Sequence, residues 1–217
     1  MTAKDIIAAR AARELSDGDI VNLGIGLPTL IPKFLPPGVH ITLQSENGFL
    51  GLAALEGEPI PDLVNAGGNP CGMAPGTAFF DSAMSFALIR GGHVDVSILG
   101  GLQVDQHGNL ANWKVPGKMV PGMGGAMDLV TGARRVIVVM EHVAKDGSLK
   151  ILSNCTLPLT AAAKVDRLIT ELAVFDIVDN QLVLVEISPD ESIETISAKT
   201  GASFVVAPHL IQMPQLN

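Results

Sequence analysis

Cysteine, long apolar runs and basic clusters are all scarce in this sequence, and each shortage excludes a class of protein. The two cysteines, Cys71 and Cys155, lie far apart, so they form neither a disulfide framework nor a Cys-x-x-Cys metal or redox site. Glycine, proline or charge interrupts every apolar run well before the roughly 18 residues of a membrane-spanning helix. The N-terminus lacks the apolar segment of a signal peptide. We therefore expect a cytoplasmic protein that makes no use of a membrane.

Positive charge is also in short supply. Lysine and arginine number 14 against 22 aspartates and glutamates, which gives a formal net charge of −8. This negative excess repels phosphate backbones, so nucleic acid is not expected as a partner. The histidines show no close ligand spacing, and we expect no metal site. They are His40, His93, His107, His142 and His209.

Apolar residues, in contrast, are abundant. They make up 47% of the chain, charged residues make up 17%, and the mean hydropathy is +0.39. This composition excludes intrinsic disorder. A chain of 217 residues fits one domain that spans residues 1–217. Because no membrane segment explains the apolar content, we expect another chain to cover part of the surface.

Strands alternate with helices along the sequence. The patterns predict helices at residues 3–15, from Pro28 onward and at 79–90, strands at 20–23, 40–45, 94–99 and 136–140, and a hairpin of 173–178 with 182–187. Residues 51–77 and 102–126 are rich in glycine and proline and are expected to be mainly loops, the former with short strands. The apolar run 136–140 is typical of a strand buried on both faces. The sequence thus predicts an α/β fold with a mostly parallel sheet flanked by helices.

In such a sheet, ligands bind beyond the carboxyl ends of the strands. The expected strands place Gly24-Ile25-Gly26, Ser45-Glu46-Asn47-Gly48 and Gly100-Gly101 at that edge. The first of these segments is no dinucleotide fingerprint, because Thr29 occupies the position of the third glycine. It is either a tight turn between a strand and a helix or a turn that lets a ligand approach the backbone closely.

Glu46 is the most informative single residue. At the end of an apolar strand, a carboxylate is either a hydrated turn residue, part of a salt bridge, or a group that uses its charge. Carboxylates can attack activated acyl groups and form covalent intermediates. The methionine-rich run 119–128 contains Gly124-Gly125, whose bare N–H groups suit an anion or a thioester oxygen. Such a run more often fills a core, and a lone Cys71 is expected to be a buried, inert thiol.

Together, these segments resemble the β subunit of family I coenzyme A transferases. Gln44-Ser45-Glu46-Asn47-Gly48 is similar to the "SENG" signature of that family, and the resemblance extends over about residues 15–208. Further matching blocks follow in the family's order at residues 22–28, 65–67, 89–95, 110–113, 116–119, 122–128, 140–142 and 156–160.

The resemblance implies an α/β fold related to those of sugar-phosphate isomerases. It also implies an enzyme of short-chain fatty acid or ketone body metabolism, in which α and β subunits form a heterodimer and pair again as an α2β2 heterotetramer. Glu46 would be the nucleophile of a covalent glutamyl intermediate, and the backbone N–H groups of Asn22 and Gly125 would stabilise the oxyanions. Coenzyme A (CoA) would be a substrate, with no permanently bound cofactor. The implied contacts to CoA or substrate are Gly24, Gly26, Asn47, Gly100, Gly101, Gln103 and Gly124.

One position bears on the substrate. Gly68 follows Asn65-Ala66-Gly67, where succinyl-type members often carry a lysine. The missing cation favours acetoacetyl-CoA with acetate or butyrate over a dicarboxylate. A succinyl-CoA:3-oxoacid CoA-transferase subunit stays an alternative, because the partner chain can supply the cation. Two others are a non-catalytic ligand-binding domain of related fold and a CoA-ester hydrolase that uses the same glutamate. We expect the chain to be inactive without its α subunit.

Overall fold

The computed structural model describes residues 2–117 and 122–214, and its centre is a large mixed sheet. Within these residues the sheet has ten strands in the order β13-β12-β11-β10-β8-β5-β1-β2-β3-β4. The five central neighbours run parallel to one another. They are β10 (Arg167–Ile169), β8 (Arg135–Val139), β5 (Val96–Gly100), β1 (Ile20–Leu23) and β2 (Thr42–Ser45). The predicted α/β fold with a parallel sheet is confirmed.

Antiparallel pairing is confined to the two sides of this parallel centre. On one side lie β11 (Ala173–Val178) and β12 (Gln181–Ile187), which form the predicted hairpin. The outermost strand there, β13 (Val205–Gln212), is parallel to β12. On the other side, β3 (Phe49–Ala53) and β4 (Gly72–Phe79) continue the sheet from β2.

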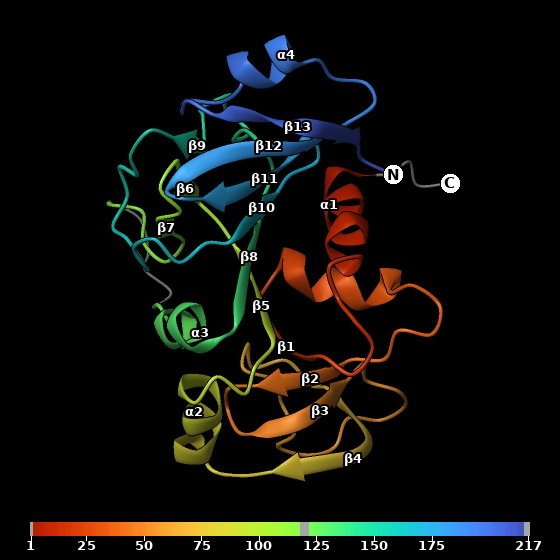
Figure 1. Ribbon diagram of the computed structural model, residues 1–217. Helices are drawn as coiled ribbons and strands as arrows, with labels where there is room; N and C mark the ends of the chain where they lie inside the picture. The colour runs from red at the N-terminus through yellow and green to blue at the C-terminus, as the bar shows by residue number, and fades with distance from the viewer. Residues whose placement is uncertain (1, 118–121, 215–217) are drawn as a thin grey trace.

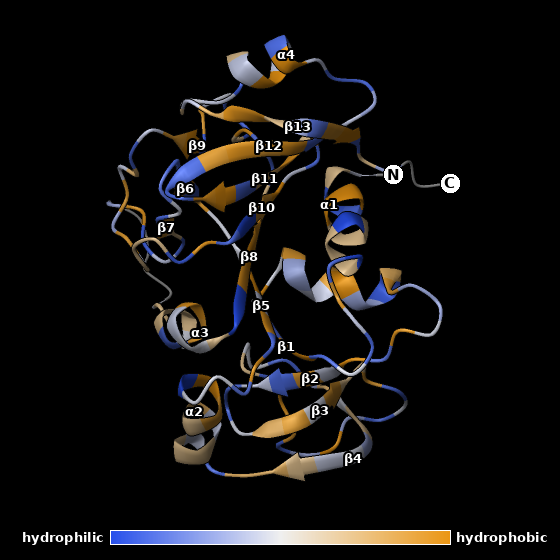
Figure 2. Cartoon of the chain, in the orientation of Figure 1, coloured by the Kyte–Doolittle hydropathy of each residue, from blue (hydrophilic) through white to orange (hydrophobic). Residues whose placement is uncertain are grey.

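Helical segments cover both faces of the parallel centre (Figure 1). The α1 helix (Ala3–Ala12) and the 3-10 helix η1 (Leu27–Phe34) pack on one face. The α2 (Ser82–Arg90) and α3 (Ala126–Gly132) helices pack on the other. The hydropathy colouring in Figure 2 shows hydrophobic residues on the central strands between them. No helix among the described residues is long and apolar enough to cross a bilayer.

The alternation of side chains along β8 connects the two layers. Val136 and Val138 belong to the core under α2 and α3, whereas Ile137 and Val139 belong to the core under α1. All four are at most 2% exposed. The prediction that this strand is buried on both faces is therefore confirmed. Because β8 and β2 run parallel within the sheet, both strands end at the same edge.

Several boundaries differ from the predictions for identifiable reasons. Residues 51–77 were expected to be loop with short strands and residues 79–90 a helix, but residues 72–79 form the eight-residue strand β4. Pro75 is tolerated within β4 because the strand lies at the sheet edge. The helix after it begins at Ser82, where the Asp81 side chain accepts the Met84 N–H at 2.8 Å. The segment after Pro28 is a 3-10 helix, since prolines within it lack N–H donors.

The sequence did not predict several short elements. The α4 helix (Ile193–Ala198) has only about one and a half turns, with a capped N-terminus. The strands β10 and β13 have weak hydrophobic patterns in the sequence. In the second loop-rich stretch, β6 (Gln103–Asp105) and β7 (Leu110–Ala111) pair with β9 (Ile151–Leu152) in a small three-stranded sheet. This sheet lies beyond the ends of β5 and β8 and so helps to enclose that edge.

His142, just beyond β8, joins three segments in the core. It is 0% exposed, and its Nδ1 and Nε2 lie 2.9 and 3.1 Å from the hydroxyls of Thr170 and Thr200. Thr170 donates its proton to the Ala173 carbonyl, so Nδ1–H donates to Thr170 and Nε2 accepts from Thr200. Burial lowers the pKa of His142 to about 4, with a further contribution from the Lys199 charge.

We therefore expect stability to fall in mild acid. Because the folded pKa lies below the unfolded value of about 6.5, the contribution is complete above that pH and is lost as pH falls towards 4. The loss amounts to about 3 kcal/mol. Urea denaturation at pH 7 and pH 4.5 measures it, with His142→Gln as the comparison. If His142→Gln loses as much stability between pH 7 and pH 4.5 as the wild type does, the lowered pKa of His142 is not the cause of the loss.

Candidate active site

The Glu46 carboxylate lies at the carboxyl edge of the parallel strands, directly after β2. Its side chain is half-buried, and its Oε2 accepts a hydrogen bond from Asn22 Nδ2 at 3.1 Å. Asn22 reaches it because β1 pairs in parallel with β2, with Asn22 opposite Gln44. On another side lies Gly125, at the start of α3, where an added Cβ would be 3.3 Å from Glu46 Cγ. Segments far apart in the sequence thus enclose one carboxylate.

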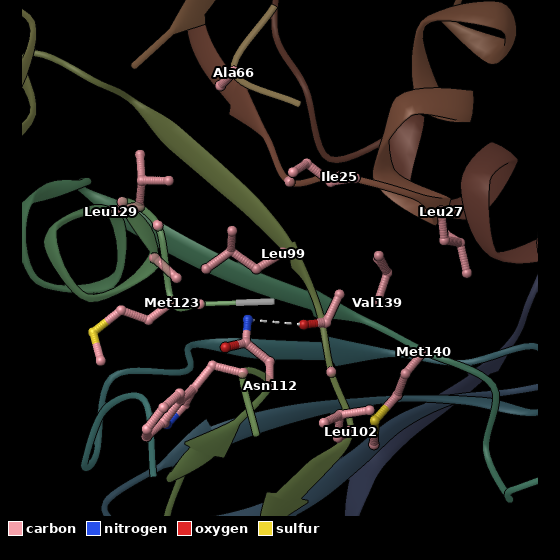
Figure 3. A pocket seen from close by; sticks show the side chains of 18 of the residues that line it. Ile25, Leu27, Ala66, Leu99, Leu102, Asn112, Met123, Leu129, Val139 and Met140 are labelled. Carbon is pink, nitrogen blue, oxygen red and sulfur yellow. Dashed lines mark hydrogen bonds between the residues drawn. The ribbon is translucent and has the colours of Figure 1, made fainter. Parts of the chain in front are cut away.

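A cavity of about 620 Å³ opens beside Glu46. Its lining includes residues at the ends of four neighbouring strands, β2, β1, β5 and β8. The distance from the first of these strands to the last is three inter-strand spacings, or about 14 Å. Figure 3 shows the apolar part of this lining and the hydrogen bond from Asn112 Nδ2 to the Gly100 carbonyl, at 3.1 Å. A Cβ added at Gly24 would lie 3.1 Å from Leu99 Cδ2, and one added at Gly101 would lie 2.8 Å from Val138 Cγ1. A side chain at either position would clash with buried residues of β5 or β8.

A second cavity of about 610 Å³ also reaches Glu46. It lies between η1 and the loop of residues 65–71 and is lined by apolar residues such as Leu23 and Leu43. Ile25 and Ala66 line both cavities, and Ile25 is 72% exposed. Cys71 also borders the second cavity, but it is 4% exposed and burial raises the pKa of its thiol. It is therefore the buried, poorly reactive thiol that the sequence predicts.

The comparisons with known proteins agree with this geometry. The family described as Coenzyme A transferase matches residues 4–199. The beta subunit of the acetate CoA-transferase of Escherichia coli K12 is 66% identical over 210 residues, which cover 97% of each chain. The chain belongs to the coenzyme A transferase family. A subunit of the probable succinyl-CoA:3-ketoacid coenzyme A transferase of Bacillus subtilis is 53% identical over 207 residues, covering 94% of this chain and 96% of that protein.

A solved coenzyme A transferase also shares the fold. The acyl-CoA transferase (YdiF) apoenzyme of E. coli O157:H7 matches with a TM-score of 0.81 at 25% identity. The match covers 98% of this chain and 43% of that one, so this chain spans less than half of that longer polypeptide. The resemblance inferred from the signature around Glu46 is confirmed.

All six site glycines predicted for this coenzyme A transferase chain lie at the cavities. Gly24, Gly100, Gly101, Gly124 and Gly125 line the first cavity, and Gly26 lines the second. No backbone acceptor among the described residues binds the Gly125 N–H. The predicted oxyanion roles of Gly125 and Asn22 remain predictions.

Asn22 also makes a side-chain contact that the sequence analysis did not predict. Its backbone lies in β1, which pairs with β2 and β5 on its two sides, and its side-chain amide makes the contact to Glu46. A polar side chain in the middle of an otherwise apolar strand was the signal for this contact.

The structure does not bring Asn47 or Gln103 to either cavity. Asn47 is exposed and fastens the turn, because its Oδ1 accepts from Ser45 Oγ at 2.6 Å and its Nδ2 donates to the Val64 carbonyl at 2.8 Å. Gln103 Oε1 accepts the N–H groups of Thr156 and Leu157, each at 2.9 Å. Both side chains are occupied in holding loops, and a direct contact to CoA stays a prediction for them. Residues 118–121, part of the methionine-rich run and of a family block, lie outside the described residues.

Sequence reasoning missed two charged residues of the first cavity, Glu141 and Lys150. Glu141 comes two residues after the end of β8, so the rule that located Glu46 also applies to it. Lys150 precedes β9, in the small sheet that the sequence did not predict. Burial lowers the pKa of Lys150 and raises the pKa of the neighbouring Glu171.

Proposed function

We propose that this chain is the β subunit of a coenzyme A transferase that moves CoA between acetoacetyl-CoA and acetate or butyrate. The observation that carries the proposal is the placement of Glu46. Its carboxylate accepts from Asn22, lies against Gly125 and borders the 620 Å³ cavity at the carboxyl edge of the sheet. A carboxylate in such a position can serve as a nucleophile towards a thioester.

The proposed reaction proceeds through two intermediates on Glu46. The carboxylate attacks the thioester carbonyl of acyl-CoA, and the C–S bond breaks to give an acyl-glutamyl anhydride and CoA thiolate. The thiolate attacks the glutamyl carbonyl and releases the first carboxylic acid, which leaves a glutamyl-CoA thioester. The second carboxylate then reverses these steps and departs as its CoA ester. Kinetics of the ping-pong type follow, because the first acid leaves before the second binds.

Each step passes through a tetrahedral oxyanion, and the residues around Glu46 support its stabilisation. The Gly125 N–H is available for that role, and such a donor is typically worth about 10²–10³ in rate. The glycine-lined cavity leaves room for the long arm of CoA, whose binding energy can lower the barrier. Exclusion of water is equally required, since water would hydrolyse the anhydride.

The choice of substrate rests on Gly68 and on the relatives. Gly68, which lies between the lining residues Gly67 and Asn69, supplies no cation to the second cavity, although Lys33 borders the same cavity. A relative at 66% identity is named for acetate, and one at 53% identity is named for succinyl-CoA and a 3-ketoacid. Gly68 and the relative named for acetate support acetate or butyrate as the acceptor, and the relative named for succinyl-CoA supports succinate as the alternative.

An α subunit would complete the enzyme, in an α2β2 assembly. The relatives in E. coli and B. subtilis are named as single subunits, and YdiF is more than twice as long as this chain. Ile25 and Leu55 line the second cavity and are 72% and 39% exposed, and Ile60, in the loop after β3, is 47% exposed. Covering them would also remove water from Glu46. We further propose a cytoplasmic enzyme, one domain over residues 1–217, and no permanently bound cofactor.

The test is an assay of the chain with its α subunit. With acetoacetyl-CoA as donor, we expect acetate and butyrate to have kcat/KM values at least about tenfold above that of succinate. The chain alone should be inactive. A preference for succinate would show that the chain belongs to a succinyl-CoA:3-oxoacid CoA-transferase instead. Rapid release of CoA without an acceptor would indicate a hydrolase.

A further inference from the structure

We propose that Ser85 is a positioning residue for the transfer reaction, acting on Glu46 through Gln44 and Asn22. The inference rests on the proposed role of Glu46 as nucleophile. Ser85 lies in α2 and lines neither cavity, so it has no direct access to a substrate. Its influence would pass through a chain of buried hydrogen bonds.

The chain consists of consecutive, directed contacts. Gln44 Nε2 donates to Ser85 Oγ at 2.9 Å. Asn22 Nδ2 donates to Gln44 Oε1 at 2.6 Å and to Glu46 Oε2 at 3.1 Å. Ser85, Asn22 and Gln44 are 0%, 1% and 2% exposed. In so dry a setting each hydrogen bond is stronger than in water, and each broken one leaves a costly unpaired group.

The groups on β2 that can only accept set the direction of the chain. The Glu46 carboxylate and the Gln44 carbonyl draw the Asn22 Nδ2, which has two hydrogens, towards β2. Gln44 then presents its Oε1 to Asn22 and its Nε2 to Ser85 Oγ, which accepts. The Gln44 carbonyl adds a longer contact to Nδ2 at 3.2 Å.

Nothing on the opposite side of the Asn22 amide fixes its orientation. Asn22 Oδ1 is buried and has no hydrogen-bond partner among the described residues. If the Ser85 hydroxyl is removed, Gln44 Nε2 loses its buried acceptor, so the Gln44 side chain can shift and withdraw Oε1 from Asn22 Nδ2. The Asn22 amide is then held less firmly, and Glu46 is less well placed for attack.

A nearby serine provides a matched control. Ser97 lies opposite Asn22 on β5, is 0% exposed, and its Oγ has no partner among the described residues. Ser97→Ala therefore removes the same buried hydroxyl, on the other side of Asn22, without breaking a hydrogen bond. Its effect on packing is similar to that of Ser85→Ala, but the chain to Glu46 stays intact.

The experiment compares variants of the chain assembled with its α subunit. Rapid quenching with acetoacetyl-CoA measures the rate of glutamyl-CoA thioester formation, and steady-state assays give kcat and KM. We expect Ser85→Ala to lower the rate of thioester formation and kcat about tenfold, the effect of losing one buried hydrogen bond, with KM little changed. Ser85→Thr, which retains the hydroxyl, should restore most of the rate, and Ser97→Ala should match the wild type.

A double-mutant cycle separates positioning from a loss of packing. Gln44→Met breaks the chain at its middle, so adding Ser85→Ala to it should cause no further loss of rate. Losses that multiply, an unchanged rate in Ser85→Ala, or an equal loss in Ser97→Ala would overturn the inference. Failure of the proposed function has a different signature, because the wild type would then form no thioester at all.

Discussion

The Glu46→Gln variant is expected to lose turnover by about 10⁴-fold or more, the range found when a catalytic nucleophile is removed. Glutamine has nearly the same volume, and its Oε1 can still accept from Asn22 Nδ2, 3.1 Å from the present carboxylate oxygen. The fold and the cavity should therefore persist. A neutral amide cannot form the acyl anhydride, so chemistry stops at the first step. Steady-state assays with acetoacetyl-CoA and acetate measure the loss.

A matched control isolates the position from the residue type. Glu58 is an exposed glutamate in the loop after β3, and Glu58→Gln makes the same chemical change. It should leave kcat within about twofold of the wild type, as is usual for a surface substitution. Thermal unfolding of both variants should match the wild type. Substantial turnover in a folded Glu46→Gln enzyme would exclude the nucleophile assignment.

Gly125 should show the second largest effect. A Cβ at this position would lie 3.3 Å from Glu46 Cγ and 3.4 Å from the Phe86 ring, so the branched side chain of valine must displace one of them. Displacement of a reacting group by about 1 Å costs on the order of 10²-fold, and disturbance of the neighbouring N–H donor adds to it. We expect Gly125→Val to lower kcat by about 10³-fold and Gly125→Ala by about tenfold.

Thr131 supplies the control for damage to the helix. It is exposed on α3, the helix that follows Gly125, and Thr131→Val introduces a valine away from both cavities. This variant should retain nearly all activity. If Gly125→Val is as active as Thr131→Val, the close approach of Gly125 to Glu46 has no role in the reaction.

The parallel centre of the fold was predictable because its strands have strong local patterns. Val136 to Val139 form an unbroken apolar run, and residues 20–23 are apolar except for Asn22, so two strands and their common edge follow from the sequence. The edge strand β4 was predictable only as a short strand within a loop-rich stretch, because Gly76 and Pro75 within it indicate a turn by local rules. Its pairing with β3 overrides those preferences.

The site shows the same division between local and distant information. Glu46 could be found from its position at the end of a strand and from its family signature. The approach of Gly125 to Glu46 depends on the packing of α3, which no local pattern encodes. The bond between Gln44 and Ser85 likewise depends on how α2 packs on the sheet. Contacts of this kind require the tertiary structure.

The central claim is that CoA becomes attached to the carboxylate of Glu46. The direct measurement is mass spectrometry of the assembled enzyme after acetoacetyl-CoA is added without an acceptor. Trypsin leaves Glu46 and Cys71 in one fragment, residues 34–90, so fragmentation must locate the adduct. Borohydride reduces a glutamyl thioester to an alcohol and leaves a permanent mark at residue 46, whereas it releases a disulfide as free cysteine. We expect the adduct and the mark at Glu46; an adduct at Cys71, or none during active turnover, would contradict the account.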